Sequence, residues 1–278
     1  MKLPASILRW PRGRPALRSK LISTSSATCF VINLDRSKDR LEDIRSQFAT
    51  QSLPFERIDA VNGAAMGEQE LAEWYSPNHT MHYYKRLNPA EIACYLSHRK
   101  AWQHIVDRAL PFAIILEDDI SISGDLAEVA NQIAQWPGDW DYIKLAEHSR
   151  RRRIVLEEQM GEVSRVTYHK VPARTCAQVV SFEGAKKLLD HSQNIARPID
   201  IDLQYWWEKN LRIFGYQPYP VEPNMHWESE IDKLAKRSHT ERHGWLKVRQ
   251  QIAFVLNNNK NIKKRLATLN AMRGRFQR

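Results

Sequence analysis

Cysteine is scarce in this sequence, and long apolar runs are missing. Cys29, Cys94 and Cys176 are too few and too scattered for a disulfide framework, and none stands in a Cys-x-x-Cys spacing. The longest apolar runs, such as residues 112–116, fall far short of the roughly 20 residues that a transmembrane helix needs. Prolines and arginines interrupt the first 20 residues, where a signal peptide would need an unbroken apolar stretch. We therefore expect a cytoplasmic protein.

Acidic residues are almost absent from the two ends of the chain. Residues 1–20 hold six lysines or arginines and no acid, and residues 233–278 hold 13 with a single acid, Glu241. Residues 21–232 hold 23 basic and 31 acidic side chains, a net charge of −8. Basic ends on an acidic centre favour an anionic acceptor or an anionic membrane surface, where each lysine or arginine contributes about 1 kcal/mol of attraction. Nucleic acid is the weaker interpretation of the same charge.

Apolar residues follow strand spacing and helix spacing in turn from residue 28 onward. We expect strands at residues 29–34, 55–60, 112–116, 141–145, 164–169 and 176–181, and helices at residues 37–48, 66–75, 125–135, 183–190 and 201–209. A longer helix follows Asn88, with Pro89 at its first position and Glu91 completing a capping box. The alternation predicts an α/β/α sandwich around a mainly parallel sheet.

Composition divides the chain into three parts. Residues 1–27 are rich in Arg, Pro, Ser and Thr without periodicity, and we expect them to be mobile. Residues 28–232 form the α/β domain. In residues 233–278, apolar side chains from Trp245 onward are interleaved with Lys and Arg, which predicts a basic helical extension. Such a helix either lies on a membrane surface or packs on the domain.

Three consecutive acids, Glu117, Asp118 and Asp119, follow the apolar run at 112–116. The run predicts a central strand buried on both faces, and acids directly after it must emerge at its carboxyl end. Ligands bind at that edge of open α/β sheets. Two carboxylates one residue apart suit a hard divalent cation that bridges to a diphosphate. A plain surface loop is the alternative interpretation of the triplet.

Four blocks of sequence occur in order around this triplet. The first, residues 31–37, reads Val-Ile-Asn-Leu-Asp-Arg-Ser and continues with Asp39-Arg40; the second, residues 55–63, reads Phe-Glu-Arg-Ile-Asp-Ala-Val-Asn-Gly. The third, residues 87–102, contains Glu-Ile-Ala-Cys and Leu-Ser-His, and the fourth, residues 115–119, ends in the triplet. In these blocks the chain resembles glycosyltransferase family 25, which includes lipooligosaccharide galactosyltransferases. The resemblance covers residues 28–232 and neither basic end.

The resemblance implies a GT-A type fold and sugar transfer with inversion at the anomeric carbon. The family uses a nucleotide-sugar donor, often UDP-galactose, together with a divalent metal, here Mn²⁺ or Mg²⁺. The acceptor would be a glycan or glycolipid such as lipopolysaccharide or lipooligosaccharide. An enzyme of this kind would work in the cytoplasm, at the cytoplasmic face of the membrane.

The resemblance also assigns metal ligands. Glu117 and Asp119 correspond to the ends of the family's acidic D-x-D-type motif, and Asp119 is the stronger candidate for direct contact. Asp118 would lie beside the donor and orient its neighbours. His226 is a further candidate, since some GT-A enzymes supply a late ligand from this part of the chain.

Five residues are candidates for contact with the donor. Asp35, Arg36 and Arg40 belong to the loop after the first strand, which contacts the nucleotide in this architecture. Their alternative role is a helix start with solvated arginines. Glu91 and His98 lie in the third block, and their alternatives are a capping box and a core histidine.

Inverting transfer needs a general base that takes the proton from the acceptor hydroxyl. Asp200 and Asp202, at the start of an apolar helix, are the candidates, and helix capping is their alternative role. Residues 175–178 depart from the family's pattern where a sugar would be contacted, so the resemblance leaves the identity of the sugar open.

Other classes of protein would share some of these features. A nucleic-acid-binding protein would account for the basic ends, but residues 28–232 hold no recognisable binding motif for it. A nucleotidyltransferase would use a similar acid pair, commonly with a Gly-rich phosphate loop, whereas Asp35-Arg36-Ser37-Lys38 occupies that position here. A glycosyltransferase-like fold without activity is the third alternative.

Overall fold

The computed structural model describes residues 7–8, 27–75, 83–147, 152–224, 226 and 244–276, with only the backbone for 7–8 and 272–276. The expected mobility of residues 1–27 concerns a segment that lies almost wholly outside these ranges. The same holds for residues 227–243, which include the first part of the expected basic extension, residues 233–243.

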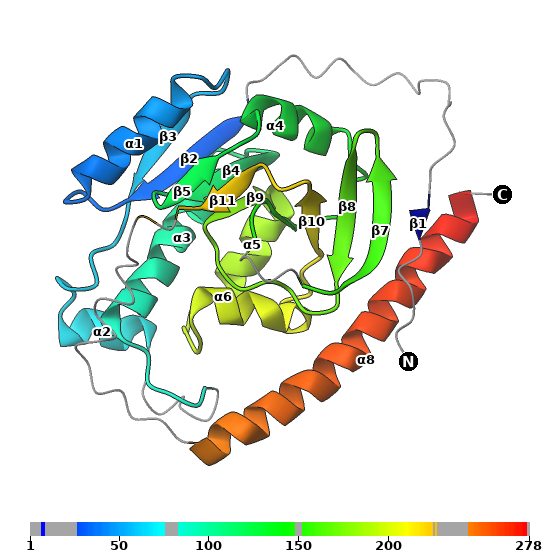
Figure 1. Cartoon of the computed structure of the whole chain (residues 1–278). Coiled ribbons are helices and arrows are strands. Elements are labelled where there is room, and N and C mark those ends of the chain that lie inside the picture. Colours follow the sequence, from blue (N-terminus) through cyan, green and yellow to red (C-terminus); the bar gives the residue numbers. More distant parts are fainter. Residues whose placement is uncertain are drawn as a thin grey trace.

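Within the described residues, nine strands form one sheet in the order β1-β7-β8-β10-β6-β9-β4-β2-β3 (Figure 1). In that order they span Ile7–Leu8, Ile154–Met160, Val163–Tyr168, Ile213–Gln217, Tyr142–Lys144, Ala177–Ser181, Phe112–Glu117, Thr28–Asn33 and Phe55–Asp59. The pairings give seven of them a common direction, and only β8 and β9 run against it. The predicted mainly parallel sheet is thereby confirmed.

Helices cover both faces of the sheet, and each face of the sheet has its own apolar core. The helices are α1 (Lys38–Phe48), α2 (Glu68–Trp74), α3 (Pro89–Asp107), α4 (Leu126–Ala134), α5 (Phe182–Asp190), α6 (Ile199–Asp202), the 3-10 helix η2 (Leu203–Glu208) and α8 (Gly244–Phe276). One core joins α1 and α4 to the sheet, and the other joins α3, α5, α6 and η2 to the opposite face. This is the α/β/α sandwich that the alternation of strands and helices predicts.

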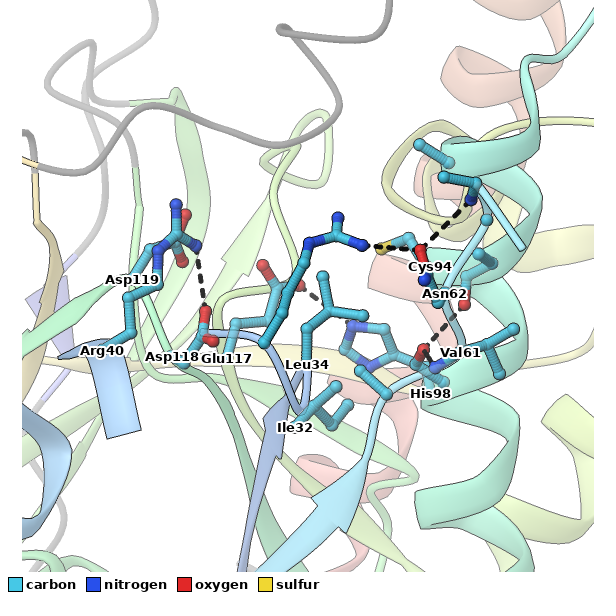
Figure 2. Close-up of a pocket in the computed structure, with 17 residues that line it drawn as sticks. Ile32, Leu34, Arg40, Val61, Asn62, Cys94, His98, Glu117, Asp118 and Asp119 are labelled. Carbon is cyan, nitrogen blue, oxygen red and sulfur yellow. Dashed lines mark hydrogen bonds and ion pairs between the residues drawn. The ribbon is translucent and has the colours of Figure 1, made fainter. Parts of the chain in front are cut away.

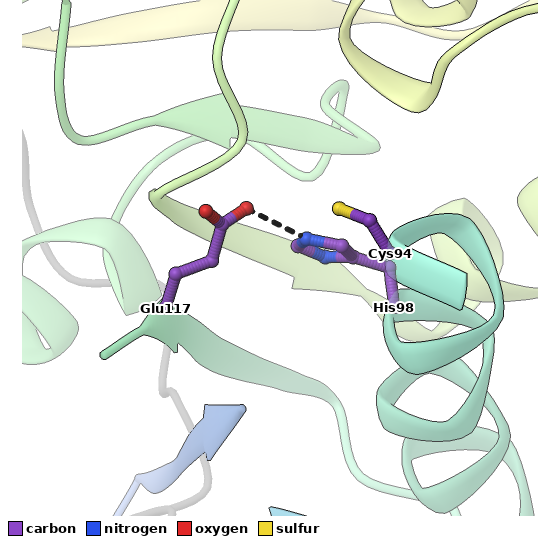
Figure 3. Close-up of side chains that lie close together, drawn as sticks. All are labelled: Cys94, His98 and Glu117. Carbon is purple, nitrogen blue, oxygen red and sulfur yellow. Dashed lines mark hydrogen bonds and ion pairs between the residues drawn. The ribbon is translucent and has the colours of Figure 1, made fainter. Parts of the chain in front are cut away.

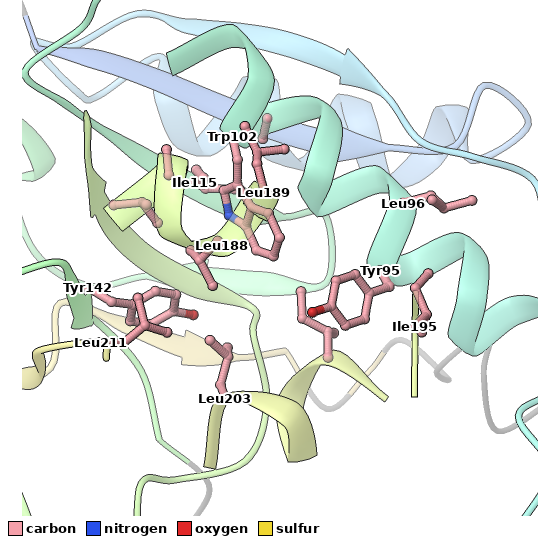
Figure 4. Packing of buried hydrophobic residues seen from close by; sticks show 14 of the residues in the cluster. Tyr95, Leu96, Trp102, Ile115, Tyr142, Leu188, Leu189, Ile195, Leu203 and Leu211 are labelled. Carbon is pink, nitrogen blue, oxygen red and sulfur yellow. The ribbon is translucent and has the colours of Figure 1, made fainter. Parts of the chain in front are cut away.

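Strand β4 lies at the centre of both cores. The side chains of Ala113 and Ile115 enter the core under α3, those of Ile114 and Leu116 enter the core under α1 and α4, and all four are fully buried. Trp102 of α3 and Leu188 of α5 pack with Ile115 in the core under α3 (Figure 4). A five-residue apolar run therefore does form a strand that is buried on both faces, as expected.

Local sequence signals place the ends of several elements correctly. At the start of α3, Asn88 Oδ1 accepts from the backbone of Glu91 at 2.9 Å, and Glu91 Oε2 accepts from the backbone of Asn88 at 3.0 Å. The predicted capping box is therefore formed. The N-cap of α4 is Asp125, whose side chain accepts from the first turn.

Three features of the sheet and its connections are missing from the prediction. Strands β1, β7 and β10 were not expected, nor was the short two-stranded sheet of β5 (Ile120–Ile122) and β11 (Val221–Pro223). The expected single helix at 201–209 is wrong, because the short helix α6 is followed by the 3-10 helix η2, whose backbone is non-helical at Tyr205. Strands of three to seven residues carry too few side chains for a clear period, so tertiary pairing decides them.

Helix α8 falls within residues 233–278, for which the sequence predicts a helical extension, and runs along the outside of the molecule (Figure 1). It contacts η2, and Phe254 packs against the rings of Tyr205 and Trp207. Among the helices that the structure describes, none is both long enough and apolar enough to cross a bilayer.

An ionic cluster at the amino end of β6 joins three elements. Asp141 is fully buried; Arg212 binds both of its carboxylate oxygens, at 2.8 and 3.0 Å, and Lys187 of α5 contacts Oδ2 at 2.8 Å. Burial by itself would raise the pKa of Asp141, but the hydrogen bonds from Arg212 and Lys187 outweigh it and the pKa lies below the usual range. The fold gains stability from the ionised form of this carboxyl.

We predict that Asp141→Asn lowers the free energy of unfolding by about 3 kcal/mol at neutral pH, because Arg212 and Lys187 lose the buried anion that they bind. The pKa is lower in the folded chain, so the stabilisation is present above the unfolded pKa of about 3.9 and is lost as the pH falls through the folded value. Urea unfolding at neutral and at acidic pH measures both effects.

The matched control is Glu56→Gln, which breaks the exposed pair between Glu56 and Arg108. Exposed pairs contribute about 1 kcal/mol or less, so this change should have a small effect. Equal losses for the two variants would contradict a special role of Asp141.

Candidate functional site

An open pocket lies at the carboxyl ends of β2, β3 and β4 (Figure 2). The end of β2, the loop at 60–64 after β3, the first half of α3 and the acidic triplet line it. It is open to solvent and holds about 720 Å³ of empty space when the solvent at its mouth is included. The pocket thus occupies the edge where open α/β sheets bind ligands.

Glu117 is held by donors from two other elements. His98 Nε2 of α3 lies 3.0 Å from Glu117 Oε1, and Thr175 Oγ1 donates to the same oxygen at 2.6 Å. Gln178 Nε2 donates to His98 Nδ1 at 3.1 Å, so the ring proton that faces Glu117 is on Nε2 and is donated to Glu117. Burial by itself would raise the pKa of Glu117, but these donors lower it below the usual range. Glu117 is therefore ionised at neutral pH.

Cys94, His98 and Glu117 bring their sulfur, nitrogen and oxygen atoms within 4.8 Å of one another (Figure 3). A metal bound there would need a thiolate and a free imidazole nitrogen. Burial raises the pKa of the Cys94 thiol well above its usual value, and both ring nitrogens of His98 are in hydrogen bonds. We interpret these three residues as a hydrogen-bonded wall of the pocket.

Asp119 contains a buried oxygen that nothing in the described part of the chain satisfies. Its Oδ1 is buried without a hydrogen-bond partner. Burial, followed by the negative charges of Glu117 and Asp118, raises the pKa of Asp119 to about 7. An unsatisfied buried carboxylate oxygen calls for a ligand, and hard oxygen donors suit Mg²⁺ or Mn²⁺. Glu117 and Asp119 therefore fit a divalent cation.

Asp118 points away from this pair, toward β2 and α1. Its Oδ2 accepts from Asn33 Nδ2 at 2.7 Å, and its Oδ1 accepts from Arg40 Nη1 at 3.1 Å (Figure 2). Burial raises the pKa of Asp118 although Arg40 lies beside it. These contacts attach the triplet to the first strand-helix unit, and Arg40 reaches the pocket wall from α1.

The remaining donor candidates are divided between the pocket and its surroundings. Arg36 lines the pocket and donates to Asn62 Oδ1 at 2.7 Å. Asp35 has a side chain that is 94% exposed, pairs with Arg57 and does not line the pocket. Glu91 also lies outside the lining residues, because its carboxylate caps α3 and binds Lys85 at 2.6 Å.

Asp200 and Asp202 have different surroundings although they are two residues apart. Asp200 Oδ1 accepts from the backbone of Ile201 at 2.8 Å, and Asp200 also accepts from the backbone of Arg174, whose φ is +71°. Burial raises the pKa of Asp200, and the negative charge of Glu117 adds to the effect. Asp200 is thus within electrostatic reach of the acidic triplet, although it does not line the pocket itself.

Asp202 is enclosed by partners. Tyr95 donates to its Oδ2 at 2.7 Å, Arg197 to its Oδ1 at 3.1 Å, and Lys209 Nζ lies 2.9 Å from Oδ2. Its carboxylate joins α3 to α6 and η2. Both carboxylate oxygens of Asp202 are therefore occupied by contacts that stabilise the fold.

His226 lies near the triplet through the pairing of β11 with β5. Pro223 is opposite Ile120 in this pairing, and the backbone of Asn224 donates to the Asp119 carbonyl at 2.8 Å. The His226 backbone donates to Asn224 Oδ1 at 3.0 Å, and its side chain is exposed. The segment that carries Asn224 and His226 is therefore held next to the triplet, although the two are far apart in the sequence.

Several residues of the site had no role in the sequence prediction. Asn33 is buried and contacts Asp118, and Ser97 Oγ accepts from the backbone of Val61 at 2.8 Å, joining α3 to the loop after β3. Thr175 and Gln178 come from the segment that departs from the family's pattern. A buried polar residue inside an apolar strand was the available signal for Asn33 and Gln178, since such residues need a partner.

Gly63 is needed where the loop after β3 crosses the start of α3. A Cβ at this position would lie 2.5 Å from the Pro89 carbonyl oxygen and 2.9 Å from Ala90 Cα, both of them backbone atoms. We predict that Gly63→Ala costs about 1–3 kcal/mol of unfolding free energy and weakens UDP binding, because the pocket wall must shift. Thermal unfolding and calorimetric titration with UDP measure the two effects.

Gly138→Ala is the control, since nothing lies within 4 Å of the Cβ that it would add. It should leave both quantities unchanged or raise stability slightly. A Gly63→Ala variant as stable as this control would contradict the packing argument.

Comparison with known proteins connects this geometry to a family. The family model described as "Glycosyltransferase family 25 (LPS biosynthesis protein)" matches residues 26–203. Procollagen galactosyltransferase 2 of Mus musculus is 27% identical over 220 residues, which cover 70% of this chain and 34% of that protein. A "probable inactive glycosyltransferase 25 family member 3" of Bos taurus is 27% identical over 233 residues, 74% of this chain and 38% of that protein. The chain spans about a third of the length of these curated relatives.

Among solved structures, a glycosyltransferase involved in glycosylation of the major capsid of PBCV-1 is 10% identical, with a TM-score of 0.41. The alignment covers 75% of this chain and 98% of the other. The family model matches more than half of the chain, including all the strands and helices that line the pocket. This chain belongs to glycosyltransferase family 25.

Proposed function

We propose that the chain is an active, metal-dependent, inverting glycosyltransferase. It transfers a sugar from a UDP-sugar, bound in the pocket at the ends of β2, β3 and β4, to a hydroxyl group of a glycan acceptor. The observation that carries this proposal is the unsatisfied Asp119 Oδ1 beside an ionised Glu117, at the edge of an open pocket at the carboxyl ends of the strands.

Glu117 and Asp119 would hold a divalent cation, Mn²⁺ or Mg²⁺, and His226 is the third candidate ligand. When bound, the cation supplies positive charge against the diphosphate of the donor. His98 and Thr175 keep Glu117 ionised and fix its carboxylate before the ligand arrives. Asp118 stays bound to Asn33 and Arg40 and fixes the position of the triplet.

The nucleotide would lie between β2, the loop at 60–64 and α3. Ala90 and Ala93 present small side chains to the pocket, which leaves space for a flat base or ribose. Arg36 and Arg40 line the pocket from the β2 side and place positive charge near the diphosphate. Asp35 and Glu91 have no place in this arrangement, because their side chains face other partners.

Asp200 is our choice for the general base, over Asp202. A base must accept the acceptor proton, and burial already raises the pKa of Asp200 toward the working range of such a group. Asp202 is bound by two cations and a tyrosine hydroxyl, so both of its oxygens are committed to structure. Lys144, buried beneath the 172–174 carbonyls, holds the segment whose backbone binds Asp200.

Galactose is the proposed sugar and a cell-surface glycan such as lipopolysaccharide the proposed acceptor. Two observations support this choice: the relatives named as procollagen galactosyltransferases and the family's description as an LPS biosynthesis protein. Thr175 and Gln178 contact the Glu117–His98 pair, so sugar selection would depend on the segment that carries them.

We predict that Asp119→Asn slows UDP release from UDP-galactose at least about a hundredfold and removes calorimetric Mn²⁺ binding. The melting temperature should stay the same or rise, because the change removes an unsatisfied buried charge. Asp190→Asn, at the exposed end of α5, is the control and should retain turnover and metal binding.

UDP-glucose and UDP-N-acetylglucosamine, with and without Mn²⁺, give the comparison for the donor sugar. Galactose 1-phosphate in place of UDP as the released product would instead indicate nucleotidyl transfer. Unchanged turnover in Asp119→Asn would refute the metal role of this carboxylate.

Asp200→Asn and Asp202→Asn should separate catalysis from folding. We expect Asp200→Asn to lower kcat about a hundredfold or more, with little change in donor KM or melting temperature. We expect Asp202→Asn to lower the unfolding free energy by about 3 kcal/mol, because Arg197 and Lys209 lose a buried anion. A loss of kcat in Asp202→Asn at unchanged stability would reverse this assignment.

A further inference from the structure

Helix α8 carries large apolar side chains on the outside of the molecule. Trp245 is 80% exposed, Leu256 66% and Ile252 58%, and Val248 and Val255 are each about half exposed. Every large apolar side chain that is exposed in the described part of the chain belongs to this set. We call these five residues the α8 stripe.

The stripe lies on one side of the helix. At 3.6 residues per turn, its five members fall within an arc of about 100°. The side chains that pack on the domain, such as Phe254, Asn258 and Ile262, occupy a different arc. Helix α8 therefore has one face that the domain covers and a second, apolar face that the domain leaves exposed.

Positive charge borders the bare face. Helix α8 contains eight lysines or arginines and no acid. Arg249 and Lys260 are exposed and fall along one edge of the stripe, and the exposed Lys263 continues the line of the stripe beyond Leu256. The exposed surface of α8 thus combines an apolar stripe with positive charge and no negative charge.

We propose that the α8 stripe docks on a membrane rich in anionic lipids. Its apolar side chains would enter the boundary between headgroups and acyl chains while the bordering cations contact the headgroups. Tryptophan, here Trp245, is typical of that interface. A second copy of the chain is a poorer partner, because two such helices would bring like charges together.

The helix is fixed to the domain, so docking would also orient the domain. Asn258 Nδ2 donates to the His169 carbonyl at 2.7 Å, and Arg265 donates to the Ile213 carbonyl at 2.5 Å. The ring of Phe254 packs against Tyr205 and Trp207. The family match ends at residue 203, so this surface lies outside it. The proposal does not depend on the sugar donor.

Cosedimentation of the full chain with lipid vesicles tests this proposal. We expect binding to vesicles of phosphatidylcholine mixed with phosphatidylglycerol, weaker binding as salt is added, and little binding to phosphatidylcholine alone. Trp245→Gln, Ile252→Gln and Leu256→Gln combined should reduce binding at least about tenfold. Lys260→Gln and Lys263→Gln should each weaken it about fivefold.

The matched control combines Ala253→Gln and Asn257→Gln, which add the same side chain at exposed positions away from the stripe. This control should bind vesicles like the natural sequence, and circular dichroism should be the same for all variants. Equal binding to neutral vesicles, or full binding by the triple variant, would overturn the proposal. So would a dimer in gel filtration that the triple variant abolishes without any vesicle binding, since it would assign the stripe to a second copy.

Discussion

Three consecutive carboxylates at the end of a central strand, with Asp118 buried and Glu117 and Asp119 partly buried, are the constraint on which the site depends. Charges cannot remain in such a place without partners, so surrounding elements must supply them. Asn33 and Arg40 supply them to Asp118, and His98 and Thr175 supply them to Glu117. These contacts join β2, α1, α3 and the segment before β9 around one strand end. Within the triplet, only Asp119 has a buried oxygen without a hydrogen-bond partner among the described residues.

Burial alone does not distinguish a catalytic acid from a structural one. Asp141 and Asp202 are both buried, but each is matched by two cations, and each holds separate elements together. Asp119 and Asp200 have no cation at hydrogen-bond distance among the described residues, and burial raises the pKa of both. Carboxylates that the fold leaves uncompensated are the ones available for chemistry.

Membership of glycosyltransferase family 25 agrees with this site, and it concerns one part of the chain. The matched residues, 26–203, include the pocket, α3 and both Asp200 and Asp202. The family contains relatives named galactosyltransferases and relatives named inactive, so family membership and activity are separate questions. Helix α8 lies beyond the matched region. The role that we propose for its apolar stripe is to place the domain on a membrane, which is separate from the choice of sugar.

The sequence by itself determined the elements with strong local signals: the apolar run of β4, the capped start of α3, the alternation that gives an α/β/α sandwich, and the triplet at the strand end. Strong local signals suffice there because each depends on neighbours within a few residues. Tertiary structure alone decided that Asp35 and Glu91 bind partners outside the pocket. It also decided that Asp202 is enclosed by partners while Asp200 is not. The pairing of β11 with β5, which places Asn224 beside Asp119, likewise depends on the tertiary structure. The sequence identifies a carboxylate but not its neighbours in space. The groups that the fold places around it decide whether it stabilises the fold or remains available for catalysis.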